Sequence, residues 1–194
     1  MAFERRPFSF LIMQENYIYH IVPRPFEGPK LIPLNRMDKQ SELYKKNFSK
    51  YVGRECLTKQ VIPLLNCLWN DVVQFSAIDP CLVAKEIKSL GGLNRSLELE
   101  VFKIPISHVV GVNKVVSYTK TVSSNRSFEL LASDFSFTTV ENYQEQKTIP
   151  LTTINYWKDA IKEERPVLWF PYITHIFVLG EVETSQLERI SLKI

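Results

Sequence analysis

The chain has 194 residues, of which 45% are hydrophobic, 12% aromatic and 23% charged. A composition this apolar and aromatic excludes an intrinsically disordered chain, and 11 Pro with 6 Gly are too few for a low-complexity or collagen-like protein. The length favours a single domain, residues 1–194, that is large enough to bury a hydrophobic core.

Charge is unevenly distributed along the chain. Residues 1–60 carry 11 Lys and Arg against 6 Asp and Glu, residues 61–140 carry 7 of each, and residues 141–194 carry 6 against 8. The net charge of +3 therefore originates in the first third of the sequence. The basic residues that cluster there with Tyr44, Phe48 and Tyr51 are Arg36, Lys39, Lys45, Lys46, Lys50, Arg54 and Lys59.

This basic cluster has two interpretations. A basic face that carries aromatic side chains can bind nucleic acid or an acidic protein, because cations meet phosphates or carboxylates and rings stack on bases. Alternatively, the segment is an amphipathic helix with a solvated basic face whose aromatic side chains pack into the core. The residues expected to contact a partner are Arg36, Lys45, Lys46, Lys50 and Arg54.

The first sixty residues combine extended and helical patterns. Residues 8–13 and 17–22 are apolar runs on either side of a Gln-Glu-Asn turn, which is typical of two strands. Four prolines between residues 23 and 33 then predict an irregular, extended segment, because proline lacks a backbone donor. Apolar residues at helical spacing predict a helix over residues 36–52, which Gly53 ends.

The next forty residues carry the clearest helix signal of the chain. Residues 61–70 are apolar and predict a short helix interrupted by a proline, and residues 71–76 predict a strand. Asp79 can cap the first turn of a helix, and Pro80 lacks only a donor that would be unpaired in that position. The helix that starts here is expected to end at the glycine pair after residue 90.

The second half of the chain is rich in strand-forming residues. A helix capped by Thr152 or Thr153 is expected to run to Glu164, and residues 184–190 predict one or two helical turns. Helices and strands mix without strict alternation, which indicates an α+β fold around a twisted, mostly antiparallel sheet with three or four helices. The strands expected in this half cover residues 97–104, 109–121, 128–140, 167–170, 174–182 and 191–194.

Compartment signals favour a cytoplasmic protein without a membrane partner. No apolar run approaches the roughly 20 residues of a membrane-spanning helix, and the first residues lack the long apolar stretch of a signal peptide. Cys56, Cys67 and Cys81 match no metal-binding or redox spacing, so we expect free thiols and no metal site.

The sequence contains no phosphate-binding glycine loop, serine nucleophile elbow or zinc-binding helix, so enzymatic activity stays open. His20 and His175 lie in apolar strands, where an imidazole either packs in the core or is held rigidly at a cleft. Strict alternation along one strand places Glu181 on the face of His175, where the two can act as general acid and base. A bulge at Gly180 would change that parity. The alternative is that the two residues belong to an exposed strand end without a catalytic role. Cys56 is a weaker nucleophile candidate, because no base is placed beside it.

Three segments together resemble ADP-ribosyltransferase-like domains, in particular the DNA-modifying ADP-ribosyltransferase toxins. The segment Tyr-Ile-Tyr-His-Ile-Val at residues 17–22 resembles the first core strand of that family. The segment Asp-Val-Val-Gln-Phe-Ser at residues 71–76, followed by Asp79 and Pro80, is similar to its strand, polar turn and proline. The segment His-Ile-Phe-Val-Leu-Gly-Glu-Val at residues 175–182 is similar to its late strand.

This resemblance implies a protein that binds NAD or a related nucleotide and modifies a macromolecule. It implies that His20 contacts the ribose of NAD and that Ser76 faces the same cleft. The family's late strand usually starts with the catalytic glutamate, whereas this chain has His175 there. Glu181 can replace that glutamate only in a different register, so the resemblance leaves the catalytic role divided between His175 and Glu181.

Overall fold

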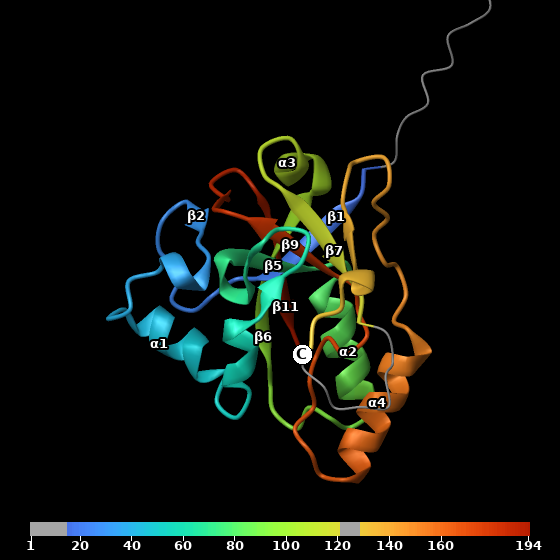
Figure 1. Cartoon of the computed structure of the whole chain (residues 1–194). Coiled ribbons are helices and arrows are strands. Elements are labelled where there is room, and N and C mark those ends of the chain that lie inside the picture. Colours follow the sequence, from blue (N-terminus) through green and yellow to red (C-terminus); the bar gives the residue numbers. More distant parts are fainter. Residues whose placement is uncertain (1–14, 121–128) are drawn as a thin grey trace, which may run out of the picture.

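A seven-stranded antiparallel sheet organises the residues that the computed structural model describes, 15–120 and 129–194 (Figure 1). The strand order is β11-β6-β1-β5-β9-β7-β8, so strands that are neighbours in the sheet are mostly distant in the sequence. Because the strands come from residues 17 to 193, the sheet unites the described parts of the chain. The strands are β1 (Tyr17–Ile21), β5 (Val72–Ser76), β6 (Glu98–Pro105), β7 (Val115–Tyr118), β8 (Phe135–Phe137), β9 (His175–Leu179) and β11 (Glu188–Lys193).

Besides the large sheet, the described residues form four α-helices and two small sheets. The predicted α+β fold is confirmed. In Figure 1, α1 lies to the left of the sheet and α2 and α4 lie at its lower right. None of the helices in the described part of the chain is long and apolar enough to cross a membrane. The helices are α1 (Glu42–Ser49), α2 (Pro80–Ser89), α3 (Ile106–Val110) and α4 (Leu151–Lys162), and the small sheets pair β2 (Lys30–Leu31) with β10 (Val182–Glu183) and β3 (Val61–Ile62) with β4 (Cys67–Leu68).

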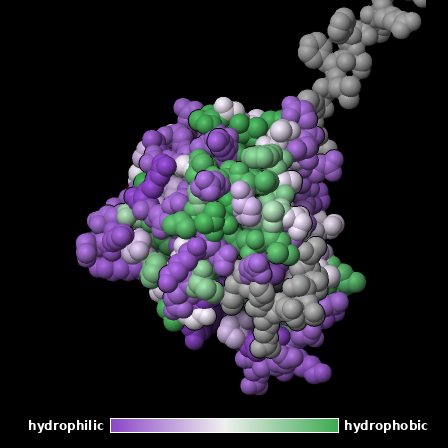
Figure 2. Space-filling view, viewed as in Figure 1, coloured by the Kyte–Doolittle hydropathy of each residue, from purple (hydrophilic) through white to green (hydrophobic). Residues whose placement is uncertain are grey.

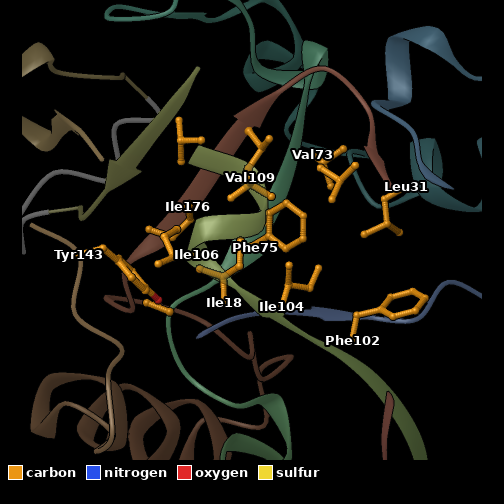
Figure 3. Close-up of a cluster of buried hydrophobic side chains, with 14 of the residues drawn as sticks. Ile18, Leu31, Val73, Phe75, Phe102, Ile104, Ile106, Val109, Tyr143 and Ile176 are labelled. Atoms are coloured by element: carbon orange, nitrogen blue, oxygen red, sulfur yellow. The ribbon is translucent and has the colours of Figure 1, made fainter. Parts of the chain in front are cut away.

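The core forms where apolar side chains of β1, β5, β6 and β9 meet α3 (Figure 3). Phe75, Ile104 and Ile176 are almost completely buried there. On the other side of β1 and β6, α2 adds Cys81 and Ala84 to a second apolar cluster. The paired strands are therefore anchored by apolar packing, which fixes the backbone on which the site residues lie.

The helix predicted at Asp79 and Pro80 is confirmed. The Asp79 carboxylate accepts a hydrogen bond from the backbone N–H of Cys81 at 2.8 Å, and Pro80 is the first helical residue. The strands predicted over residues 17–22, 71–76 and 97–104 correspond to β1, β5 and β6. The strand predicted over residues 8–13 lies outside the described residues.

Two predicted helical segments are wrong. Residues 61–70 form the β3–β4 hairpin and a following 3-10 turn, because Asn66 adopts a left-handed conformation with φ of 49° and turns the chain back. Residues 184–190 run into β11, where pairing with β6 outweighs the weak helical pattern.

Other predicted boundaries change where tertiary contacts decide. The strand predicted over residues 109–121 starts only at Val115, because residues before it form α3. Among the described residues of the predicted strand 128–140, only Phe135–Phe137 pair with the sheet. Residues 167–170 form no strand. The caps predicted for α4 are also wrong, since Pro150 precedes the helix and the Thr153 hydroxyl donates to the Pro171 carbonyl instead.

Helix α1 differs from both its predicted length and its predicted packing. It is shorter than residues 36–52 because Ser41 caps it, accepting a hydrogen bond from the Tyr44 N–H. No residue of α1 is buried, so the prediction that aromatic side chains of this segment pack into the core is wrong for Tyr44 and Phe48. It holds for Tyr51, beyond the end of α1, which packs against a buried apolar cluster. Tyr44 and Phe48 instead stack on each other, with ring centroids 5.5 Å apart, and Phe48 is 41% exposed.

Candidate functional site

The sheet opens between β1 and β5. These strands pair at a single position, Tyr19 opposite Ser76, and diverge beyond it. If the antiparallel ladder continued, Ile21 would lie opposite Gln74. The Gln74 carbonyl instead accepts a hydrogen bond from the ring of His20, with 2.8 Å between His20 Nδ1 and the oxygen. A side chain thus spans a gap where backbone pairing stops.

A cavity of about 710 Å³ lies in this gap and extends to α1. Consecutive residues of both strands line it, which is expected where two diverging strands expose both of their faces. We call this cavity the fork pocket. The predicted site residues among its lining are His20, Ser76, His175, Lys46, Lys50 and Arg54.

His20 is held as a neutral imidazole with a defined tautomer. A carbonyl oxygen only accepts hydrogen bonds, so His20 Nδ1 carries the proton that Gln74 accepts. Burial is the main cause that lowers the pKa of His20 to about 4; the positive charge of Lys50 acts in the same direction, and the Gln74 hydrogen bond opposes both. At neutral pH, Nε2 is therefore an unprotonated acceptor. It has no hydrogen-bond partner in residues 15–120 and 129–194.

His175 shows the same arrangement at the start of β9. Its Nδ1 donates to the Ile173 carbonyl at 2.9 Å, and burial lowers its pKa. Its Nε2 is likewise an acceptor without a partner within the part of the chain that the structure describes. Ser76 pairs with both Tyr19 and His175, which puts the Tyr19 and His175 backbones about 10 Å apart at roughly 4.8 Å per strand. His20 follows Tyr19 and points to the other face, so the two imidazoles reach the pocket from opposite sides of the sheet.

Ser76 contributes less to the pocket than its position suggests. Its side chain is buried, and its hydroxyl accepts a hydrogen bond from the Ile78 N–H at 3.1 Å. This bond shapes the turn between β5 and α2. The hydroxyl proton is still available for donation to a ligand oxygen.

Three of the five predicted basic residues line the fork pocket. Lys46 donates to the Arg24 carbonyl at 2.9 Å, Lys50 to the Asn47 side chain at 2.8 Å, and Arg54 to the Lys50 carbonyl at 2.8 and 3.0 Å. None of the salt bridges among the described residues involves these three side chains, so their charges are not neutralised. Partial burial lowers the pKa of Lys50, and the nearby ammonium of Lys46 lowers it further.

The other two basic residues lie elsewhere on this surface. Arg36 belongs to a 3-10 turn before α1, and Lys45 lies on α1 itself; both are exposed and neither lines the fork pocket. The surface over α1, at the left of Figure 2, is mostly hydrophilic, whereas apolar residues gather toward the centre of this face. The basic cluster therefore divides into a pocket-facing and an outward-facing part.

Glu181 does not join His175. Strand β9 ends at Leu179, and Gly180 with φ of 105° turns the chain into β10, which belongs to a different sheet. His175 lies at the opposite end of β9, about 13 Å from Leu179 at roughly 3.3 Å per residue. The exposed Glu181 carboxylate forms a salt bridge with Lys30 at 3.2 Å. The expectation that alternation along one strand pairs Glu181 with His175 is therefore wrong.

The structure adds residues that sequence patterns did not indicate. Gln74 fixes the His20 tautomer through its backbone carbonyl, which no side-chain motif can reveal. Phe170 lines the pocket with its ring 6.3 Å from that of His175. Trp69 also lines it and donates through Nε1 to the Tyr51 hydroxyl at 3.2 Å, which ties the segment after α1 to the start of β5.

The cysteines lie outside this arrangement. Cys56 is exposed, Cys67 is half-buried and Cys81 is buried, and none of them lines the fork pocket. Burial raises the pKa of Cys67 to about 11 and that of Cys81 to about 12, which keeps these thiols protonated. No group of three or more His, Cys, Asp or Glu within the described ranges is arranged to hold a metal ion.

Comparison with known proteins gives no relative. No family model matches the chain, no curated protein matches it, and no solved structure resembles it closely enough to count as a match. The argument for function therefore depends on the fork pocket and on the residues that line it.

Proposed function

We propose that this protein is an ADP-ribosyltransferase-like protein that binds NAD or a related nucleotide in the fork pocket. The observation that carries the proposal is the presence of two neutral imidazoles and three unneutralised cations in one cavity of about 710 Å³. That volume is within the usual range for a small-molecule or cofactor site.

The chemistry of the lining matches the two polar parts of a nucleotide. Ribose hydroxyls are hydrogen-bond donors, and the Nε2 atoms of His20 and His175 are acceptors. Phosphate oxygens accept charge-assisted hydrogen bonds, which Lys46, Lys50 and Arg54 can donate. Lys50 and His20 line the same cavity, so a phosphate at Lys50 and a ribose at His20 can belong to one ligand.

Isothermal titration calorimetry with NAD, ADP-ribose and ATP tests this proposal. We expect saturable binding at one site and an affinity loss of about tenfold or more in His20→Asn, since a lost hydrogen bond in a pocket costs roughly 1–2 kcal/mol. His108→Asn is the matched control, because His108 lies on α3, is bonded to the Glu183 carbonyl and does not line the pocket. Absence of binding by all three ligands would contradict the proposal.

The transferase step has a separate readout. Transfer of the ADP-ribosyl group to a nucleophile of an acceptor macromolecule forms a new bond at the ribose carbon, breaks the bond from that carbon to nicotinamide, and releases free nicotinamide, which chromatography detects. His175 is the member of the predicted catalytic pair that lines the pocket, so we expect His175→Asn to reduce release and Glu181→Gln to leave it unchanged. The reverse order of effects would assign the chemistry to a different part of the molecule.

The exposed stack on α1 favours a second candidate function, an interaction module that binds nucleic acid or an acidic protein. Tyr44 and Phe48 are not buried, and Lys45 extends from the same helix into solvent. Binding of this kind weakens steeply as salt increases, because cations on the protein displace counterions from the partner. Flat salt dependence, or unchanged binding in Lys45→Glu, would reject it; Lys158→Glu on α4 is the control.

A further inference from the structure

A buried side-chain amide faces the fork pocket without a hydrogen-bond partner. Asn70 lies in the 3-10 turn Trp69–Asp71, between β4 and β5, and it lines the pocket although only 3% of the residue is exposed. Its carboxamide forms no hydrogen bond with another described residue. The Thr138 hydroxyl is the one completely enclosed side-chain group without a partner in this part of the chain, so both polar atoms of Asn70 reach the pocket surface. An unpaired amide destabilises the free protein, and a ligand with matching groups removes that penalty.

The turn that contains Asn70 lies beside the cationic part of the pocket. The indole of this turn donates a hydrogen bond to the Tyr51 hydroxyl at 3.2 Å, and Tyr51 follows Lys50 directly in the sequence. Asn70 precedes Gln74, whose carbonyl accepts from the His20 ring, by four residues, which span at most about 14 Å of chain. A nucleotide with a ribose at His20 and a phosphate at Lys50 can therefore extend its base to Asn70.

The side chains around this amide are apolar. Two further 3-10 turns, which contain Leu34 and Leu57, pack against the turn of Asn70. The Asn35 side chain joins the first of them to the Asp71 carboxylate with a hydrogen bond of 2.7 Å. Both leucines line the fork pocket. A subsite with apolar walls and one neutral amide fits a flat heteroaromatic base better than a charged group.

We propose that Asn70 is the specificity-determining residue by which the fork pocket binds adenine. This inference rests on the proposed function and names the base that the bound nucleotide carries. Adenine presents an amino donor beside a ring-nitrogen acceptor, and a carboxamide presents the complementary acceptor and donor. Oδ1 of Asn70 accepts from the 6-amino group and Nδ2 donates to the neighbouring ring nitrogen.

Calorimetric titration of the full chain with ADP and with the 5′-diphosphate of purine riboside tests this inference. The second ligand differs from ADP only in lacking the 6-amino group. We expect ADP to bind about tenfold more tightly, and we expect this ratio to fall to about one in Asn70→Leu, a substitution of similar volume. Asn35→Ala is the matched control, because Asn35 belongs to a neighbouring turn, is exposed and does not line the pocket, so this variant should preserve the ratio.

Thermal melting separates ligand recognition from a structural role of the same residue. Asn70→Leu replaces an unpaired buried amide with an apolar group of similar size, so the free variant should melt at the same temperature as the unmodified chain or up to about 4 °C higher. A lower melting temperature, or a variant that does not fold, would show that the amide stabilises the protein itself and would refute the inference.

The outcomes also separate this inference from the proposed function. If ADP-ribose binds but ADP has no advantage over the purine analogue, or if Asn70→Leu retains the tenfold ratio, the role of Asn70 is refuted and the nucleotide site stands. If ADP, ADP-ribose, NAD and ATP all fail to bind the unmodified chain, the proposed function fails and this inference fails with it.

Discussion

Protonation of His20 should make the fold less stable in mild acid. Burial lowers the pKa of His20 from 6.5 to about 4, so the unfolded chain binds a proton more readily than the folded chain. Stability is therefore complete above the unfolded pKa and falls as the pH drops toward the folded one. The full difference corresponds to roughly 3 kcal/mol, of which about 2 kcal/mol is lost between about pH 7 and about pH 5.

Urea denaturation followed by circular dichroism at these two pH values measures the loss. His20→Asn keeps an N–H near the position of Nδ1, where the Gln74 carbonyl accepts, but cannot titrate. We expect the variant to lose about 2 kcal/mol less than the unmodified chain on acidification, because other titrating groups are common to both proteins. His175→Asn should also lose less stability on acidification than the unmodified chain, because burial lowers the pKa of His175 as well. Equal losses in the unmodified chain and His20→Asn would refute the account of His20 as a half-buried, neutral imidazole.

Substitutions at three further positions test the scaffold by the free energy of unfolding in urea. Phe75→Ala should cost about 3–5 kcal/mol, because Phe75 is only 1% exposed at the centre of the core; a cost under about 1 kcal/mol would contradict its burial. Asp79→Ala should cost about 1 kcal/mol through loss of the α2 cap, whereas Asp79→Asn should retain most of the stability. Gly180→Ala should destabilise by at least about 1 kcal/mol, since φ is 105° and an added Cβ would lie 3.2 Å from the Asn113 side chain; a neutral result would contradict the turn that separates Glu181 from β9.

Local chemistry made parts of the fold predictable. Asp79 and Pro80 specify the start of α2 through the local capping hydrogen bond and the position of the proline, without contacts from distant residues. The hairpin of β3 and β4 was missed because its turn requires Asn66 in a left-handed conformation, and the apolar pattern of the segment does not indicate such a turn. The first half of strand β11 was missed because its pairing with β6 joins residues about ninety positions apart.

The candidate site was predictable as separate residues but not as an assembly. Apolar strands around His20 and His175 indicated rigid imidazoles, and the structure brings both to one pocket. Strands β1, β5 and β9 are neighbours because of the sheet topology, which the spacing of residues in the sequence does not indicate. The predicted pairing of Glu181 with His175 was wrong because the alternation of β9 was extended across Gly180, where the chain turns out of the sheet.

Nitrogen-15 NMR of the histidine side chains tests the central claim, that one nucleotide-binding pocket contains both imidazoles. In the unmodified chain, the two Nε2 resonances should have the chemical shifts of unprotonated acceptors near neutral pH. Addition of NAD should shift the Nε2 signals of His20 and His175 together, with one common saturation curve, and leave the His108 signal unchanged. Signals of His20 and His175 that stay in place at saturating NAD, or that respond with different affinities, would contradict a shared nucleotide site.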